Sequence, residues 1–245
     1  MIKKLTLLLM LLIATSSNLF GQVQVGMGTN IEQKTPFNAY YGYTYSQSIY
    51  LASEINATGS ITSIQWYYTG NGELPNNQDL VIYMGTTTKT AFSSTTDWVA
   101  VSELTQVYSG GIVTNSTPGW KTITLTTPFA YDGLSNLVVA VDENQELYDN
   151  YDDKFYNSSV TGTRSIFVYN DENNPSPSSP PEAYDIASFV PNIIFGGITQ
   201  ACPTPYYVDV MGITTTTATV TWQPSATTPE NGSSYYISAS DAIPT

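Results

Sequence analysis

Histidine is absent from this chain of 245 residues, and cysteine occurs once, at Cys202. Without histidine, the chain can form neither a Ser-His-Asp nor a Cys-His catalytic group, and no zinc site built on imidazole. A single cysteine cannot form a disulfide within the chain. Of the common hydrolytic arrangements, only paired carboxylates and a Ser-Lys pair remain open.

Basic side chains are also scarce, with seven Lys and Arg against 20 Asp and Glu, for a formal net charge of −13. Such a surface repels the phosphates of nucleic acids and anionic lipid headgroups, so neither is expected as a partner. Hydrophobic residues make up 41% of the chain, and 19 residues are tyrosine. This composition indicates a folded protein and not a disordered acidic tail.

Only one apolar run is long, from Leu5 to Ala14, and it follows the basic head Met1 to Lys4. Small and polar residues then continue to Gln22. This order is typical of a cleavable secretory signal, and the run is about half of the roughly 20 residues that cross a bilayer. We therefore expect residues 1–22 to be a signal peptide and the mature protein to be secreted or at the cell surface, without membrane insertion. An N-terminal membrane anchor is the alternative.

Short strands joined by turns are predicted throughout residues 23–198. Residues 61–69 alternate so that Ile64, Trp66 and Tyr68 share one face, while 80–84 and 137–141 are continuous apolar runs typical of central strands. Residues 47–55 also have a strand pattern, and 95–104 hold at most a helical turn. The Thr, Tyr, Val and Ile bias with turn signals predicts an all-β fold, a jelly-roll-like β-sandwich.

Two tryptophans, Trp120 and Trp222, are assigned to the cores. Trp120 begins the predicted strand 120–126, in which Ile123 and Leu125 occupy the opposite face. Trp222 follows Ala218 and Val220 at period two in the C-terminal region.

The C-terminal region begins with a predicted linker at residues 199–205, which contains Cys-Pro-Thr-Pro. Residues 206–245 resemble the first three strands of a fibronectin type III domain, with Trp222 in the place of the core tryptophan of that fold. Such a domain needs roughly 90 residues, so we expect a truncated immunoglobulin-like sandwich whose other strands lie downstream. The partner of Cys202 is expected there too.

The larger region resembles a recurrent module of secreted and cell-surface proteins of Bacteroidota-type bacteria. The segments that carry the resemblance are 45–51, 61–64, 81–87, 128–133 and 136–144. Proteins with this module often carry fibronectin type III repeats and a C-terminal sorting domain for type IX secretion. The resemblance therefore implies an exported multidomain protein, and it implies no defined ligand or reaction.

Three tyrosines, Tyr41, Tyr43 and Tyr45, recur at period two and are predicted to face one side of a strand. Flat aromatic rings beside Asn, Asp and Gln are typical of sugar recognition, because rings stack on the apolar faces of sugars while polar side chains bind the hydroxyls. We therefore predict a glycan-binding strip at these residues. The alternative is that the tyrosines pack on or inside the sandwich.

A second candidate site is acidic and follows a predicted strand. Its residues are Asp142, Glu143, Asp149, Asp152 and Asp153. Carboxylates on loops supply the oxygen ligands that calcium needs, although the regular spacing of an EF-hand loop is absent. Calcium is thus the one cofactor that the sequence suggests, and solvated loops that bind nothing are the alternative.

No spacing singles out a catalytic pair of carboxylates, so we predict a non-catalytic protein. The favoured function is adhesion or carbohydrate binding, with a glycan or an extracellular matrix component as partner. One alternative is an accessory region of a secreted hydrolase whose catalytic domain lies outside this chain. Another is a structural stalk module without a ligand. The sequence makes no prediction about oligomeric state.

Overall fold

The computed structural model describes residues 21–32, 34–70, 78–112, 117–146 and 153–200, and the backbone of 206–211 and 219–223. The chain divides into two compact units, the first ending at Gln200 and the second beginning at Ala201. Among the described residues, no helix reaches the length and apolarity that crossing a membrane requires. Residues 1–20 of the predicted signal peptide lie outside the described residues.

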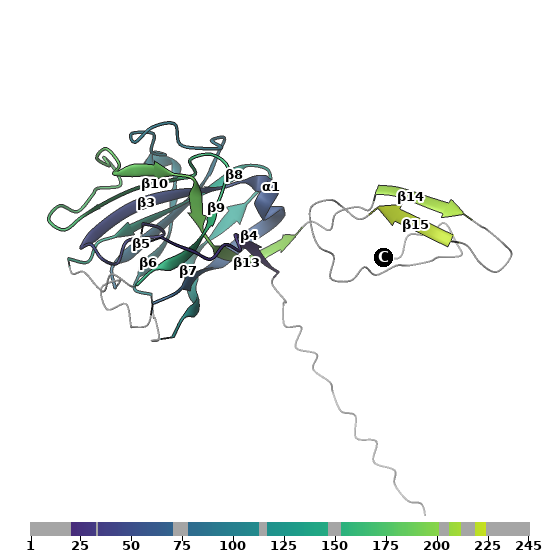
Figure 1. The fold of residues 1–245 in the computed structure, drawn as a ribbon, viewed down its shortest axis with the longest axis horizontal. Coiled ribbons are helices and arrows are strands. Elements are labelled where there is room, and N and C mark those ends of the chain that lie inside the picture. The colour runs from purple at the N-terminus through teal and green to yellow at the C-terminus, as the bar shows by residue number, and fades with distance from the viewer. Residues whose placement is uncertain are drawn as a thin grey trace, which may run out of the picture. The chain divides into compact units, whose positions relative to one another are not determined.

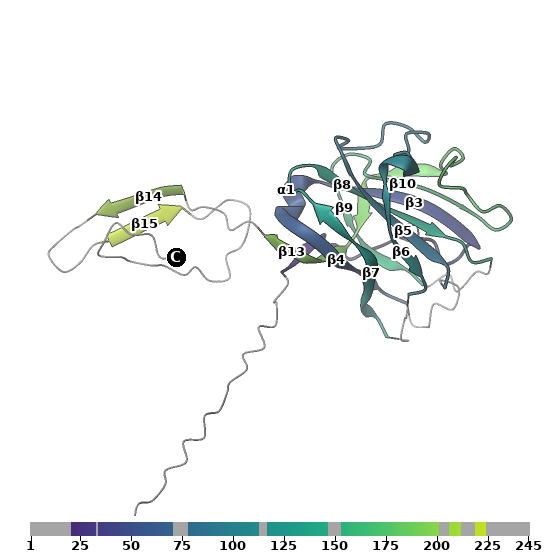
Figure 2. The same ribbon diagram turned by 180° about the vertical axis from the view of Figure 1, so that it is seen from behind.

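Two antiparallel sheets form the first unit (Figures 1 and 2). Sheet A has the order β1 (Gln22–Val25), β13 (Ile193–Gln200), β4 (Ala57–Tyr68), β9 (Phe155–Ser159) and β12 (Phe189–Pro191), with β2 (Asn30–Glu32) on β9 and β7 (Gly119–Tyr131) on β4. Sheet B has the order β11 (Asp185–Ala187), β10 (Ser165–Asn170), β3 (Tyr43–Tyr50), β8 (Asn136–Glu143), β5 (Leu80–Thr87) and β6 (Thr105–Gly110). This arrangement confirms the predicted all-β sandwich.

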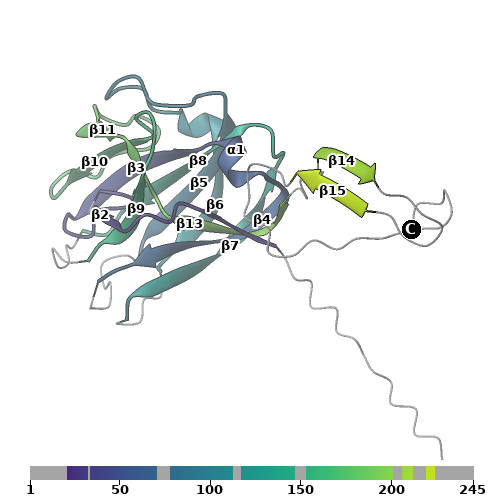
Figure 3. The ribbon, with the colours of Figure 1, turned by 45° about the vertical axis from the view of Figure 1, so that its right-hand side comes forward.

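The main core lies between the sheets, which Figure 3 shows with β10, β3 and β8 above β9, β13 and β7. The predicted inward face of β4 is confirmed, since Ile64, Trp66 and Tyr68 are all buried in one apolar cluster. Alternating positions of the neighbouring strand β7 and of β5 and β8 in sheet B complete that cluster, among them Leu80, Ile82, Met84, Ile123, Leu125, Val139 and Val141. Each large apolar side chain buried here stabilises the fold by about 1.5–3 kcal/mol.

Residues 52–55 form a short helix, α1 (Ala52–Ile55), so the strand predicted through residue 55 is wrong beyond Tyr50. Backbone N–H groups of Glu54 and Ile55 donate to the Leu51 carbonyl. Asn56 then takes a left-handed φ of 42°, which Asn tolerates better than most residues and which ends the turn. The alternating pattern predicted a strand here because Ile55 is buried, but Ile55 belongs to the helical turn.

Trp120 is half-buried on the outer face of sheet A, so its assignment to the core is wrong. Its ring packs edge-on against Tyr67, with 5.4 Å between centroids. Lys121, Ile123 and Leu125 occupy the inward positions of β7 and leave Trp120 on the other face. The small helical turn expected in residues 95–104 is confirmed as η1 (Val101–Glu103).

In the C-terminal region, Thr199 and Gln200 belong to β13, where they pair with Thr58 and Ala57. The predicted linker therefore overlaps the last two residues of that strand. The second unit contains β14 (Tyr206–Met211) paired antiparallel with β15 (Thr219–Gln223). The side chain of Trp222 and the remainder of the linker lie outside the described residues, and the fibronectin type III domain stays a prediction.

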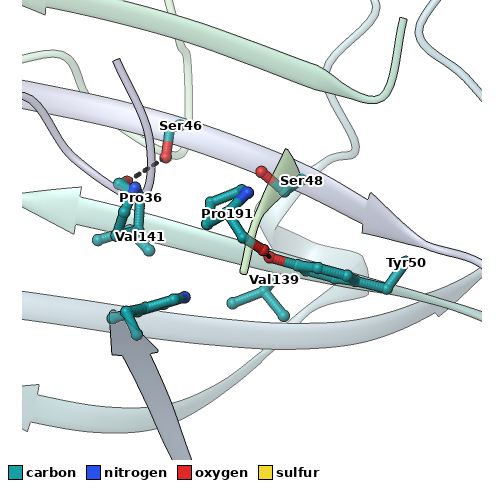
Figure 4. Close-up of a pocket in the computed structure, with 8 residues that line it drawn as sticks. Pro36, Ser46, Ser48, Tyr50, Val139, Val141 and Pro191 are labelled. Carbon is teal, nitrogen blue, oxygen red and sulfur yellow. Dashed lines mark hydrogen bonds between the residues drawn. The ribbon is translucent and has the colours of Figure 1, made fainter. Parts of the chain in front are cut away.

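Figure 4 shows a part of the core where hydroxyl groups of β3 lie among apolar side chains. The Ser46 hydroxyl donates to the Pro36 carbonyl at 2.5 Å, and the Tyr50 hydroxyl donates to the Pro191 carbonyl at 2.9 Å. The space between them is too small for a water molecule. Buried carbonyls without a strand partner are thus satisfied by side chains from β3.

An ion pair between the buried Arg164 and the more exposed Glu54 joins α1 to the chain segment before β10. The guanidinium of Arg164, 2% exposed, binds both carboxylate oxygens of Glu54 at 2.6 and 2.8 Å. Glu54 also accepts the backbone N–H of Leu51. The pair therefore holds the helical turn against sheet B.

Replacing Glu54 with Ala leaves the Arg164 charge buried without its partner. We expect the free energy of unfolding to fall by about 1–3 kcal/mol, the cost of leaving a buried polar group without its partner, because the exposed side of Glu54 lets water replace part of the interaction. Equilibrium denaturation with urea measures it. Lys89→Met is the control, because it breaks the more exposed pair with Asp97 and should cost no more than about 1 kcal/mol. Equal losses in the two variants would contradict the role given to Arg164.

Candidate functional site

Two loops cover the outer face of sheet B. The first, residues 88–104, joins β5 to β6, and the second, residues 171–184, joins β10 to β11. Beneath them lie β10 and β3, which are side by side in Figures 1 and 3. Apolar residues of the sheet and the loops form a second cluster, made of Ile49, Phe92, Val99, Val138, Ile166 and Ala183. The central strands β3 and β8 of sheet B are therefore buried on both faces.

Gln47 in β3 fixes the middle of the first loop. Its side-chain amide donates to the Val99 carbonyl at 2.8 Å, and its carbonyl accepts the Val99 backbone N–H at 2.9 Å. The amide also donates to the Tyr45 hydroxyl at 2.9 Å. All of these groups are buried, so the strand face dictates where Val99 and the neighbouring Trp98 lie.

Trp98 connects the two loops. Its indole ring packs on the buried ring of Tyr45, with 5.0 Å between centroids and 32° between planes. The indole N–H donates to the Pro181 carbonyl of the second loop at 2.9 Å. Two more hydrogen bonds join the loops, from the Ala183 N–H to the Thr95 carbonyl at 2.8 Å and from the Thr95 hydroxyl to Glu182 at 2.8 Å.

An open groove of about 410 Å³ lies between these loops, and we call it the Trp98 groove. Its lining residues are Thr96, Trp98, Ala100, Val101, Ser102, Pro177, Ser178, Ser179 and Pro180. They combine one indole and two proline rings with four hydroxyl groups. This volume and this mixture of flat apolar groups and hydroxyls are typical of sites for small polar ligands.

The three predicted tyrosines do not share one exposed face. Tyr45 is fully buried beneath Trp98, and burial raises the pKa of its hydroxyl to about 12. Tyr43 is half-buried at the first position of β3. Tyr41 precedes the strand and packs on Tyr169, with 4.2 Å between ring centroids. Ligand binding by Tyr41 and Tyr43 stays a prediction, whereas Tyr45 contributes to the groove by supporting Trp98 from below.

The acidic residues predicted for calcium are only partly described. Asp142 accepts the Asn144 side-chain amide, Glu143 accepts the Gln145 N–H, and Asp153 accepts the Tyr68 hydroxyl. Asp149 and Asp152 lie outside the described residues. Within the part of the chain that the structure describes, no three acidic, cysteine or histidine side chains gather as metal ligands. The calcium site therefore stays a prediction.

Asp142 and Glu143 are nevertheless unusual carboxyls, because both are buried at the end of β8. Burial raises the pKa of Asp142 to about 6 and that of Glu143 to about 9, and each is raised further by the nearby Asp79. As neighbours on a strand, they point to opposite faces of sheet B. This orientation does not suit a shared metal ion or a catalytic pair.

No protein-family model and no curated protein matches this chain. Among solved structures, it is similar to a crystal structure of the cysteine protease and lectin-like domains of a surface-layer-associated protein of Clostridium difficile, with 11% identity and a TM-score of 0.27. The similarity covers 63% of this chain and 32% of the other, so the matched part is about a third of that protein chain. A likeness this weak carries no argument about function.

Gln47→Leu should loosen the first loop. It leaves the N–H and carbonyl of Val99 buried without partners, and each such group costs about 1–3 kcal/mol. We expect a matching fall in the free energy of unfolding, measured by chemical denaturation. Ser94→Ala removes an exposed hydroxyl from the same loop and should change stability by less than about 0.5 kcal/mol. A Gln47 variant as stable as the parent would show that the hydrogen bonds between Gln47 and Val99 are dispensable.

Glu143→Gln should stabilise the protein at alkaline pH. Because the folded pKa is raised from 4.5 to about 9, the folded state holds a proton that the unfolded state has lost across this range. Stability therefore falls as pH rises from 4.5 to 9, and glutamine removes that fall. Thermal unfolding should give a higher Tm for the variant at pH 8 and no difference at pH 4.

Asp132→Asn provides the opposite case. Hydrogen bonds from Ser135 and Leu134 lower the pKa of the Asp132 carboxyl. Its contribution to the stability of the fold is therefore present at neutral pH and is lost on acidification. We expect this variant to have the lower Tm at pH 7. If both variants shift Tm in the same direction at pH 8, burial is not the cause of the Glu143 effect.

Proposed function

We propose that this protein is a non-catalytic carbohydrate-binding module of an exported surface protein, and that the Trp98 groove is its binding site. The observation that supports the proposal is the groove itself, about 410 Å³ in volume, with an indole ring and four hydroxyl-bearing residues among its lining. The export of the protein rests on the predicted signal peptide.

The chemistry of the groove suits a sugar. A pyranose ring has apolar C–H faces, which stack on the indole of Trp98 or on proline rings, and a rim of hydroxyls. Thr96, Ser102, Ser178 and Ser179 carry hydroxyls that both donate and accept hydrogen bonds, as sugar hydroxyls do. The volume falls within the roughly 300–1,000 Å³ of small-molecule sites.

The frame of the groove is built by contacts within the protein. Gln47 holds Val99, Tyr45 supports the ring of Trp98, and Trp98 is hydrogen-bonded to Pro181. A site fixed in this way loses little conformational entropy on binding, which favours affinity for a small ligand.

Binding without catalysis is supported by the side chains that line the groove. None of the nine is a carboxylic acid, an amine or another group that titrates near neutral pH. General acid–base catalysis needs such a group within hydrogen-bond reach of the reacting atoms. The lining offers rings to stack on and hydroxyls to bind, and no proton donor or acceptor for hydrolysis.

Trp98→Ala tests the proposal. The full chain is applied to a glycan array, and the bound glycan is then titrated by calorimetry. We expect the variant to lose at least about tenfold in affinity, equivalent to 1.4 kcal/mol, because the stacking surface is removed. Ser102→Ala keeps the indole and should weaken binding a few-fold, in line with about 0.5–1.5 kcal/mol for a hydrogen bond.

Leu134→Ala is the matched control, and circular dichroism verifies the fold of every variant. Leu134 is 86% exposed and precedes β8, whose first residues pair with the end of β3 away from Tyr45. This control should bind as the parent does. Undiminished binding by Trp98→Ala would reject the groove as the site, and no binding to any glycan would favour a structural stalk.

A further inference from the structure

The nine residues of the Trp98 groove carry no charge. They are rings, methyl or isopropyl groups and hydroxyls. An anionic sugar that enters such a groove must lose hydration around its carboxylate or sulfate, and no cationic side chain in the lining compensates for the loss. A neutral sugar has no such cost, because each of its hydroxyls replaces a hydrogen bond to water with one to a serine or threonine hydroxyl.

The charged residues next to the groove are acidic. Asp97 lies between the lining residues Thr96 and Trp98, Glu103 follows Ser102, and Glu182 lies beyond Pro180 on the second loop. Lys89 is bound to Asp97 at 2.5 Å and offsets its charge, which leaves the charges of Glu103 and Glu182. The local potential is therefore negative, in keeping with the formal net charge of −13, and it opposes the approach of an anion.

We propose that the Trp98 groove selects uncharged glycans and excludes those whose bound unit carries a carboxylate or a sulfate. This inference rests on the proposed function, because it names the ligand class of the same groove. The selection has two parts: the lining pairs with hydroxyls alone, and the acidic residues around it repel anions.

Matched polymers separate the inference from the proposed function. Affinity electrophoresis of the full chain compares dextran with dextran sulfate and hydroxyethyl cellulose with carboxymethyl cellulose, beside a glycan array that contains both classes. We expect Trp98-dependent binding among the neutral glycans and at least about tenfold weaker binding of the anionic ones, a difference of 1.4 kcal/mol. Trp98-dependent binding that favours an anionic glycan would overturn the inference and leave the function in place. No binding in either class would reject both.

A charge placed in the lining tests the physical cause. Ser179 is an exposed lining residue, so Ser179→Lys should fold normally. We expect this variant to gain at least about tenfold in affinity for dextran sulfate, and the gain should fall as salt screens the new charge. The parent's binding of a neutral glycan should change less than about twofold between 0.05 and 0.5 M NaCl.

Leu134→Lys is the control for net charge. It adds the same one unit of positive charge, but at an 86% exposed residue that precedes β8 and does not line the groove. We expect no gain for dextran sulfate from this variant. If both lysine variants gain equally, the net charge of the protein and not the lining of the groove decides the ligand class, and the inference is wrong.

Discussion

The central strands of sheet B, β3 and β8, are buried on both faces, and the covering of this sheet by loops follows from that constraint. A sheet packed on one side only presents polar residues to water on the other, whereas β3 is buried at nearly every position, polar ones included. Its inward face meets sheet A, and its outward face meets the loops 88–104 and 171–184. Those loops must therefore be ordered, because they supply the partners that water supplies to a half-exposed sheet.

The polar residues of β3 determine how the covering loops lie. Ser46 binds the Pro36 carbonyl on the inward side, and Gln47 binds both backbone groups of Val99 on the outward side. A buried amide with unpaired groups is costly, so only loop conformations that satisfy Gln47 are stable. The position of Trp98 follows from that of Val99, and the groove exists because Trp98 then reaches Pro181.

Charge has two separate roles in this molecule. The buried Arg164 serves the fold through its pair with the more exposed Glu54, while the acidic surplus of the chain gives the surface its negative potential. Asp142 and Glu143 do not fit either group, because burial favours their protonated forms. An uncharged groove in an acidic surface is the combination from which we infer a preference for neutral glycans.

Local sequence pattern was sufficient for the all-β class and for the inward face of β4, since alternation has a period of two whatever the strand pairs with. The pattern was insufficient for residues 52–55, because an apolar residue such as Ile55 can be buried from a helical turn as well as from a strand. It was also insufficient for Trp120, because an aromatic ring on the outer face of a sheet can pack on its neighbours there. The period of Tyr41, Tyr43 and Tyr45 indicated an aromatic site near β3, but the ring that lines the groove is the half-buried Trp98, 53 positions after Tyr45. Only the tertiary structure decided this, because the groove joins residues 96–102 to 177–180, and contacts between distant loops depend on how two sheets and their coverings pack.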